Sequence, residues 1–342
     1  MNKVNTIAEL PAISVLLPVF FRHVSVTQSR LLREALESVV DQRYGGLLEI
    51  LLVDDGSPTP IETLAHQLGP AARHVRWLRL YRNRGIVGAL NAGIAAAKTP
   101  LIARIDADDL WLDGKLQAQV AQFIEDPDLT ISATGMVRVD TRGAEIDRHV
   151  RPGDWSGILR FFVENGCPFP HGSIVADRRI YRALGGYPSS GTVRHCEDYA
   201  LWGTWLRFFK PAMVEKALYS YRVSGGSVSS EHAAQQTAAS QGVRHRFERL
   251  ELAYVLPKVL PTLAEALGVS LFEAGLLAYT AWHFRPAMAI PEDAIVPLGA
   301  VLPDRVLTRT ETAPSWRTVV EIPGEDNRKL ISVRADSLGV LG

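Results

Sequence analysis

The chain has 342 residues, of which 47% are hydrophobic and 22% charged, a balance typical of a soluble globular protein with a sizeable core. Its 37 lysines and arginines equal its 37 aspartates and glutamates, which argues against a broad electrostatic surface for nucleic acid. The two cysteines, Cys167 and Cys196, are too few for a disulfide framework or a zinc motif and favour a reduced, cytoplasmic setting.

The first hundred residues alternate between short apolar, β-branched runs and helix-like stretches. Such alternation is typical of β–α–β units that build a parallel sheet. The predicted strands are 12–20, 48–55, 75–81 and 100–106, and the predicted helices between them are 29–42, 60–69 and 86–98.

The rest of the chain shows three features. Residues 115–223 continue the pattern, with helices predicted over 115–127 and 195–209 and strands over 129–140 and 212–223. The stretch 150–200 is rich in Gly, Pro, His and aromatic residues, and we expect binding loops rather than scaffold there. From about residue 231 the sequence becomes helical in character, so we predict a first domain over 1–230 and a C-terminal helical extension and tail over 231–342. No run of about eighteen apolar residues predicts a membrane-spanning helix. We expect a cytoplasmic protein, at most peripheral at the inner face of the plasma membrane.

Three of the predicted strands are followed by polar or glycine-rich residues: VDDGS (53–57), YRNRG (81–85) and IDADD (105–109). Ligands collect at the carboxyl ends of parallel strands. If the last strand continues through IDADD, Asp106 and Asp108 point the same way and repel each other unless a positive charge lies between them. Hard oxygen ligands suit Mg²⁺ or Mn²⁺. The other interpretation is a polar turn whose aspartates cap the next helix. Capping alone does not explain why three polar strand ends converge.

The two earlier strand ends carry less specific signals. Asp54 and Asp55 fit an ordinary Asp-Gly turn, or a carboxylate that accepts the ring N–H of a pyrimidine base. Asn83, Gly85 and Asn91 lie at the mouth and first turns of a predicted helix, where glycine permits close backbone approach to a phosphate. The chain contains neither GxGxxG nor GxxxxGK[ST], so a dinucleotide or P-loop site gains no support.

Taken in order, the segments ISVLLPVF, VDDGS, NRGIVGALNAG, LIARIDADD and EDYALW resemble those of the family 2 glycosyltransferases, particularly bacterial enzymes that build cell-surface polysaccharides. The resemblance covers residues 12–225. It implies the GT-A fold, a Rossmann-like α/β fold with a mainly parallel sheet flanked by helices. It also implies a nucleotide-sugar donor (UDP-sugar foremost), a glycan or lipid-linked acceptor, Mn²⁺ or Mg²⁺ at the DxD motif, and inversion at the anomeric carbon.

Carried over position by position, the resemblance gives a donor side to the site. Asp106 and Asp108 match the DxD motif, and we expect Asp108 to be the direct metal ligand and Asp106 to lie nearer the ribose. The remaining matches, to the loops around the base and the nucleotide, are Pro18, Phe20, Asp54, Asp55, Asn83 and Gly85.

The resemblance also implies an acceptor side. Asp198 matches the general base and Glu197 its neighbour at the acceptor. The segment 169–179 resembles the acceptor-side segment, with His171 and Arg178 as candidates, and Arg222 matches the end of the catalytic domain. A carboxylate within hydrogen-bond reach of a sugar hydroxyl can take its proton during attack. Asp198 can cap the following helix at the same time.

Two features qualify this assignment. Ser224 stands where the family often has a histidine, which puts a histidine metal ligand in doubt. Trp202 and Trp205 lie at helical spacing, which favours core packing over stacking on an acceptor sugar.

Two alternative functions are weighed against a glycosyltransferase. A sugar nucleotidyltransferase would need a glycine-rich basic loop after the first strand, where this chain has PVFFRHVSV. A non-catalytic nucleotide-sugar-binding protein is disfavoured by the intact Asp106, Asp108 and Asp198.

Overall fold

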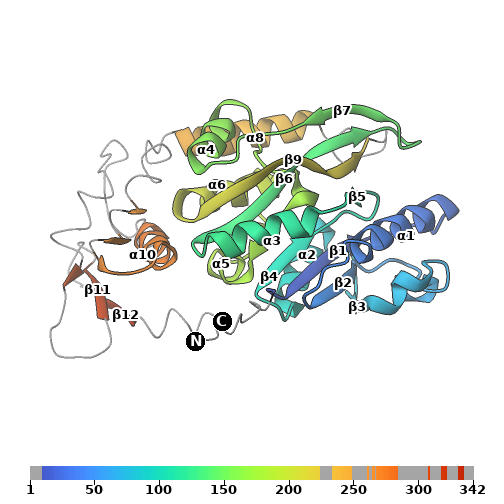
Figure 1. Ribbon diagram of the computed structural model, residues 1–342, viewed down its shortest axis with the longest axis horizontal. Helices are drawn as coiled ribbons and strands as arrows, with labels where there is room; N and C mark the ends of the chain where they lie inside the picture. The colour runs from blue at the N-terminus through green and yellow to red at the C-terminus, as the bar shows by residue number, and fades with distance from the viewer. Residues whose placement is uncertain are drawn as a thin grey trace, which may run out of the picture.

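The computed structural model describes residues 10–223, 233–248, 260–261, 264–265 and 267–283, together with three short strands between 307 and 334 (Figure 1). The predicted domain boundary at residue 230 and the departure noted at Ser224 lie outside the described residues.

One large sheet organises the described part of the chain, and nine strands belong to it there. Its main path runs β3-β2-β1-β4-β8-β6-β9-β5, and β7 pairs with β6 at the side. The first four strands are parallel to one another, whereas β8 is antiparallel to both β4 and β6. The strands are β1 (Ile13–Val19), β2 (Leu48–Asp54), β3 (Val75–Arg79), β4 (Leu101–Arg104), β5 (Leu110–Trp111), β6 (Leu129–Val139), β7 (Glu145–His149), β8 (Val175–Asp177) and β9 (Lys210–Arg222).

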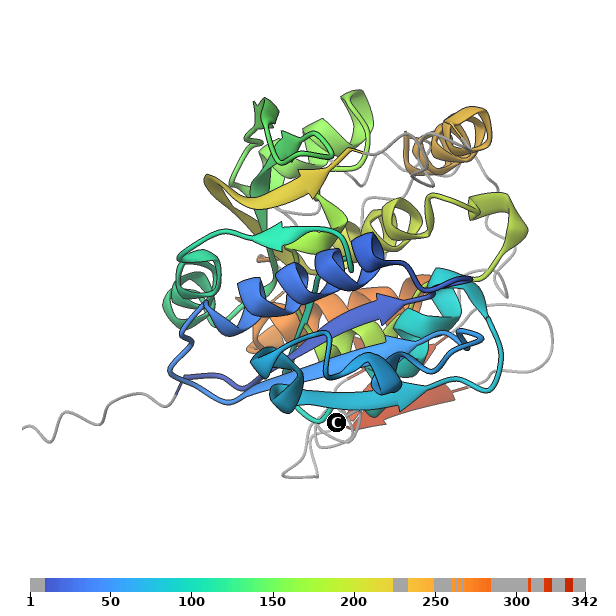
Figure 2. The same cartoon turned by 90° about the vertical axis from the view of Figure 1, so that its right-hand side faces the viewer.

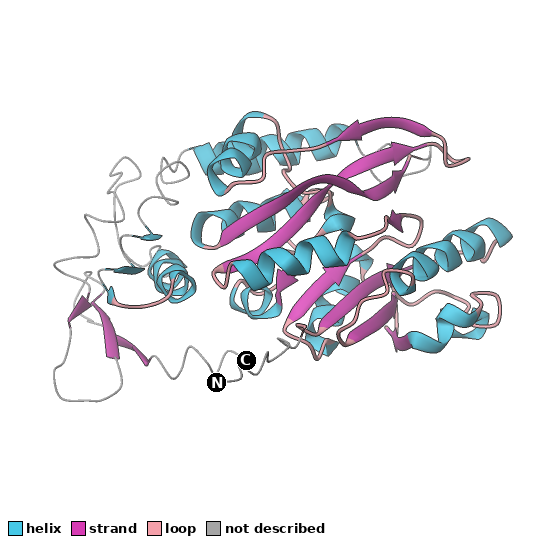
Figure 3. Cartoon of the chain, viewed as in Figure 1, coloured by secondary structure: helices cyan, strands magenta, loops and turns pink. Residues whose placement is uncertain are grey.

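Helices cover both faces of this sheet (Figures 2 and 3). The α-helices are α1 (Val26–Val40), α2 (Gly85–Ala96), α3 (Lys115–Glu125), α4 (Trp155–Glu164), α5 (Arg178–Ala183), α6 (Glu197–Phe208), α8 (Ala233–Glu248) and α10 (Leu271–His283). Short 3₁₀ helices are η1 (Ile61–Leu64), η2 (Pro70–His74), η3 (His171–Ser173) and η4 (Gly191–Val193).

Alternation along the central strands separates two apolar cores. In β1, Val15 and Leu17 face the core that α1 and α3 cover, while Leu16 faces the core that contains α2, α4 and α6. Successive strand residues point to opposite faces, so a strand buried on both faces is almost wholly apolar. The same alternation puts Ile102 of β4 on the face covered by α2. Arg104 is two residues further along the strand and therefore points to the same face.

The predicted strands and the helices α1, α2, α3 and α6 are confirmed, within a few residues at their ends. Trp202 and Trp205 are fully buried, which confirms the core interpretation. The predicted helix over 60–69 is wrong: only the single 3₁₀ turn η1 forms there, directly after Pro60.

Two further expectations need correction. Residues 150–200 combine loops with scaffold, because they also contain α4, α5 and the sheet strand β8. β8 has only three residues, too few for a period-two pattern to predict it from the sequence. The strand predicted over 100–106 ends at Arg104 and is followed by a turn, in which the Asp109 N–H donates to the carbonyl of Asp106. The two DxD carboxylates therefore do not share a strand face.

The region beyond residue 231 contains helices as predicted, and part of it packs on the sheet domain. Val243 of α8 and Leu276 of α10 are buried in the core that also contains α6. Three strands that were not predicted, β10 (Leu307–Thr308), β11 (Arg317–Glu321) and β12 (Leu330–Arg334), pair in a separate antiparallel sheet. Among the described residues, no helix is both long and apolar enough to cross a membrane.

Candidate active site

The polar strand ends identified in the sequence meet at one edge of the sheet. The chain proceeds from β1 outward through β2 and β3, then returns to place β4 on the other side of β1. Ligands of open α/β sheets bind at such a reversal of strand order, beside the carboxyl ends of the strands. The residues gathered there follow β1 (Phe20), β2 (Asp55) and β4 (Asp106).

Asp54 and Asp55 anchor the loops around this edge. Asp54 is buried and accepts the N–H groups of Ser57 at 2.8 Å and Ile61 at 3.1 Å, and it also pairs with Arg79. Asp55 accepts the N–H of Arg84 at 2.8 Å, and burial raises its pKa. Both carboxylates therefore have protein partners: Asp54 orders the loop after β2 and ties it to β3, and Asp55 holds that loop against the start of α2.

The 82–93 segment divides into an exposed mouth and a fixed helix. Asn83 is exposed and accepts the N–H of Gly85, whose φ of +73° requires the left-handed conformation that glycine adopts freely. Asn91 lies deeper, where its amide donates to the carbonyl of Tyr187 at 2.9 Å and accepts the Tyr187 N–H at 2.8 Å. Asn91 thus clamps α2 to the Tyr187 backbone.

Arg104, which the sequence analysis did not select, occupies the centre of the site. Its guanidinium makes two parallel contacts with Asp106, at 2.5 and 2.9 Å, and its Nε is buried without a partner among the described residues. Burial opposes the charge, yet the Asp106 carboxylate holds the pKa of Arg104 above its ordinary value. A lone arginine two positions before an aspartate, in an otherwise apolar strand, is the sequence signal that could have identified this pair, since residues i and i+2 share a face.

The three acidic residues of the turn after β4 have different surroundings. Asp109 is buried, where it accepts the N–H of Arg222 at 2.7 Å and the hydroxyl of Tyr219. Asp108 reaches solvent and forms no ion pair with any residue that the structure describes. Desolvation by the surrounding protein and the negative charge of Asp106 raise the pKa of Asp108 to about 6.

Arg222 holds the acidic turn from behind. Its Nε donates to the carbonyl of Asp108 at 3.1 Å, and its Nη2 lies 3.4 Å from the Glu34 carboxylate. Since its side chain is only 9% exposed, Arg222 supports the turn from within the protein.

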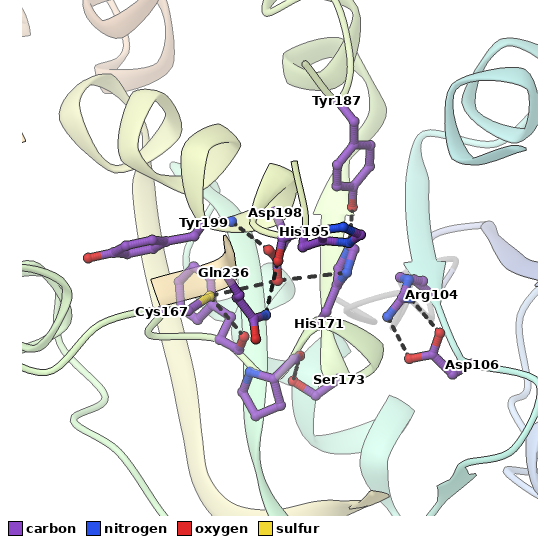
Figure 4. Close-up of polar contacts among 12 residues, drawn as sticks. Arg104, Asp106, Cys167, His171, Ser173, Tyr187, His195, Asp198, Tyr199 and Gln236 are labelled. Carbon is purple, nitrogen blue, oxygen red and sulfur yellow. Dashed lines mark hydrogen bonds and ion pairs between the residues drawn. The ribbon is translucent and has the colours of Figure 1, made fainter. Parts of the chain in front are cut away.

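Asp198 stands at the first turn of α6 on the same face as Arg104 (Figure 4). Its Oδ1 accepts the Tyr199 N–H at 2.8 Å, while its Oδ2 lies 3.8 Å from both His171 Nδ1 and Cys167 Sγ. Burial raises the pKa of Asp198, although the Tyr199 N–H and the charge of Arg104 oppose the shift. A carboxylate with a raised pKa, whose Oδ2 has only long contacts with the Cys167 thiol and the His171 ring, is suited to accept a proton.

The surroundings of Asp198 fix its position. His171 Nε2 is 2.7 Å from the Tyr187 hydroxyl, and burial together with the charge of Arg104 holds the pKa of His171 well below its usual range. His195, just before α6, has a positive φ of 67°, and its carbonyl accepts from Gln236 of α8 at 2.9 Å. The helix α8 thus contacts the loop that leads into Asp198.

The remaining sequence candidates lie at varied distances from this centre. Pro18 is buried near the end of β1, Phe20 is 40% exposed just after it, and Glu197 is half-buried beside Asp198. Arg178 is not brought to the site. Because β8 runs antiparallel to β4, Arg178 lies at the amino end of β4, where its N–H donates to the carbonyl of Pro100.

A mainly parallel α/β sheet with an acidic turn at its switch point, faced by a helix that begins with carboxylates, is the architecture of a nucleotide-sugar transferase of the GT-A type. The family model "Glycosyl transferase family 2" matches residues 14–185. The chain belongs to this glycosyltransferase family and is an enzyme of that class.

Comparison with individual proteins agrees with this family. The chain is 31% identical over 219 residues to the glycosyltransferase EpsE of Bacillus subtilis (strain 168), covering 62% of this chain and 73% of that protein. It is 28% identical over 194 residues to an uncharacterized glycosyltransferase of Rickettsia felis, covering 57% of this chain and 31% of that longer protein.

Two solved structures share the fold. S. aureus TarS 1–349 in complex with UDP-GlcNAc aligns with a TM-score of 0.52 at 15% identity, covering 83% of this chain and 84% of that one. The mannosyltransferase PcManGT from Pyrobaculum calidifontis, in complex with GDP-Man and Mn²⁺, aligns with a TM-score of 0.50 at 18% identity, covering 82% of this chain and 81% of that one. The family match sets aside the alternative of a sugar nucleotidyltransferase in favour of a glycosyltransferase.

Proposed function

We propose that this enzyme transfers a sugar, with inversion, from a UDP-sugar to a glycan or lipid-linked acceptor in cell-surface polysaccharide synthesis. The observation that carries the proposal is the placement of Asp198: it shares one face of the sheet with the acidic turn, and Arg104 lies between the two carboxylate groups. A base on one side of the anomeric carbon and a leaving diphosphate on the other imply a single displacement, hence inversion. A lipid-linked acceptor would bring the enzyme to the inner face of the membrane.

The acidic turn fits a divalent cation through one carboxylate in particular. Asp108 is exposed, has no cationic partner among the described residues, and has a raised pKa that a nearby positive charge would lower again. Asp106 is already paired with Arg104, so Asp108 is the stronger candidate ligand. Mg²⁺ is commonly held by one or two carboxylates plus substrate phosphates, and this turn offers that number. When bound, Mn²⁺ or Mg²⁺ would neutralise charge on the departing diphosphate.

The chain's own residues supply the remaining chemistry. Asp198 Oδ2 accepts the proton of the acceptor hydroxyl, while Oδ1 stays fixed by the Tyr199 N–H. Asn83 and Gly85 at the exposed mouth of α2, together with Phe20 and Asp55, line the expected path of the nucleotide. We further propose that residues 1–230 form the catalytic domain and that 231–342 form an extension against it.

The test compares Asp198→Asn with Glu197→Gln, its neighbour on the same helix turn. The N-cap of α6 is Cys196, and Asp198 lies inside the first turn instead of capping the helix. Asn has the same size as Asp and its Oδ1 can still accept the Tyr199 N–H, so the fold should persist. Without a proton acceptor the transfer rate should fall by about 10²–10⁴-fold, the usual contribution of a general base. Donor affinity, measured by titration of UDP-, GDP- and dTDP-sugars with Mn²⁺, should stay near that of the wild type.

The transfer rate is the difference between the release of free nucleotide measured with acceptor and that measured without it. If Asp198→Asn transfers sugar at the wild-type rate while Glu197→Gln does not, the base is Glu197. If both variants retain full activity, the assignment of the acceptor side to the start of α6 is wrong.

A further inference from the structure

A chain of buried polar groups runs from α5 to Asp198. The hydroxyls of Tyr181 and Tyr187 are 3.3 Å apart, and the Tyr187 hydroxyl is 2.7 Å from His171 Nε2. On the other side of the same ring, His171 Nδ1 lies 3.8 Å from Asp198 Oδ2 (Figure 4). Tyr187 and His171 therefore each have a neighbour on both sides, and the direction of donation along the chain decides whether a proton or a lone pair of His171 Nδ1 faces Asp198.

Only one direction of donation places a proton between each pair of neighbouring groups, from Tyr181 through Tyr187 and His171 to Asp198. If Tyr181 donates to Tyr187 and Tyr187 donates to His171 Nε2, the neutral imidazole carries its proton on Nδ1, facing the Asp198 carboxylate. In the reverse direction a lone pair on Nδ1 would face that carboxylate, which is unfavourable in a buried site. Arg104 lies close enough to oppose a second proton on the ring, so the imidazole stays neutral.

We propose, on the basis of the function proposed above, that His171 is a positioning residue whose Nδ1–H, fixed by Tyr187, acts with Asp198 to hold the acceptor hydroxyl. A separation of 3.8 Å is too long for a direct hydrogen bond, but an oxygen about 2.8 Å from each atom fits between them. That oxygen accepts from His171 Nδ1 and donates its proton to Asp198 Oδ2, and a remaining lone pair is free to attack.

The geometry also shows where the proton goes. Once Asp198 has taken it, the groups beyond His171 are the buried hydroxyls of Tyr187 and Tyr181, whose pKa values are raised by burial. These hydroxyls offer no easy onward route, so the proton remains on Asp198 until the product leaves. His171 therefore acts as a fixed donor and not as a second base.

Replacements at His171 separate a donor from a base. The amide nitrogen of Asn occupies the place of Nδ1, whereas that of Gln occupies the place of Nε2. His171→Asn should retain activity within about tenfold of the wild type, while His171→Gln and His171→Leu should lose about 10–100-fold in kcat, because the acceptor oxygen loses its donor as negative charge develops on it. Tyr187→Phe, which frees the tautomer, should fall between these results.

The pH profile gives a readout that loss of packing would not reproduce. The Nδ1–H dipole of His171 points its positive end at Asp198 Oδ2 from 3.8 Å, which favours the charged carboxylate, so His171→Leu should move the acid limb of kcat to higher pH and His171→Asn should leave it in place. The charged or titratable groups that face this pair are Arg104 from β4, Glu197 from α6, Tyr181 from α5, Tyr187 after it, and Cys167 before η3. Cys167→Ala is the matched control, because the thiol lies at the same 3.8 Å from Asp198 Oδ2.

Three results would overturn the proposal. If His171→Asn is as inactive as His171→Leu, the ring must titrate and His171 is a base or relay. If His171→Leu keeps the wild-type rate and acid limb, His171 has no role. If Cys167→Ala shifts the acid limb instead, the thiol is the donor. The function proposed above fails separately, through an active Asp198→Asn. Melting temperatures of all variants identify any that are simply unfolded, and Tyr187→Phe, which removes a single oxygen, then serves as the test.

Discussion

Asp108→Asn should make the metal-free enzyme more stable while removing its response to metal. Surrounding protein and the charge of Asp106 raise the pKa of Asp108 to about 6, against about 3.9 in an unfolded chain. A shift of about two units corresponds to a cost of about 3 kcal/mol for the ionised group at neutral pH. Because the side chain reaches solvent, screening reduces this to about 1 kcal/mol. An amide removes that cost, which should raise the melting temperature by about 2–4 °C.

The sign of the pH dependence follows from the same shift. A carboxyl whose pKa is raised in the folded state binds its proton more tightly there, so its destabilising effect is absent below about pH 4 and complete above about pH 6. The melting temperatures of Asp108→Asn and wild type should therefore coincide near pH 4 and separate as the pH rises to 7.

The assay is thermal unfolding with a chelator between pH 4 and 7.5, using Asp113→Asn from the same segment as the control. Added Mn²⁺ should raise the melting temperature of the wild type, because a hundredfold excess over the dissociation constant stabilises the folded state by about 2.7 kcal/mol. The melting temperature of Asp108→Asn should not change. A variant that is less stable than wild type at pH 7, or equally stabilised at every pH, would refute the reasoning. A variant that still responds fully to Mn²⁺ would remove Asp108 from the metal site.

Three further predictions concern the supports of the site. Arg104→Met should cost about 3 kcal/mol in urea unfolding because it removes the cationic partner of Asp106 and leaves only the Tyr219 hydroxyl. Adding Asp106→Asn should restore most of that cost; additive costs would show that the two residues are not coupled. Asn91→Ala should cost about 2 kcal/mol, since the N–H and C=O of Tyr187 lose their partners, and unchanged urea unfolding would show that water replaces the amide. A chain that ends near residue 230 should be poorly soluble, because without Val243 and Leu276 the apolar core surface they cover is exposed to water. A truncated protein that is active, and monodisperse in size-exclusion chromatography, would show that α8 and α10 are dispensable.

The sequence by itself predicted the first half of the fold and the convergence of polar strand ends at one edge of the sheet. Apolar β-branched runs of strand length gave β1 to β4, and polar residues after those runs indicated the ligand edge, because periodicity and strand ends are local properties. The family resemblance added Asp198, which Figure 4 shows in the same region as Arg104 and Asp106.

Tertiary structure alone decided which of these side chains meet. β8 inserts antiparallel beside β4, which carries Arg178 away from the site and brings His171 towards it, and no local pattern in three residues predicts that pairing. The Tyr187–His171–Asp198 contacts join segments from separate parts of the chain, so they depend on packing between elements and not on spacing within one. The Arg104–Asp106 pair lies between these cases. Its spacing is visible in the sequence, but only the structure shows that the Arg104 side chain is buried away from water and pairs with the Asp106 carboxylate.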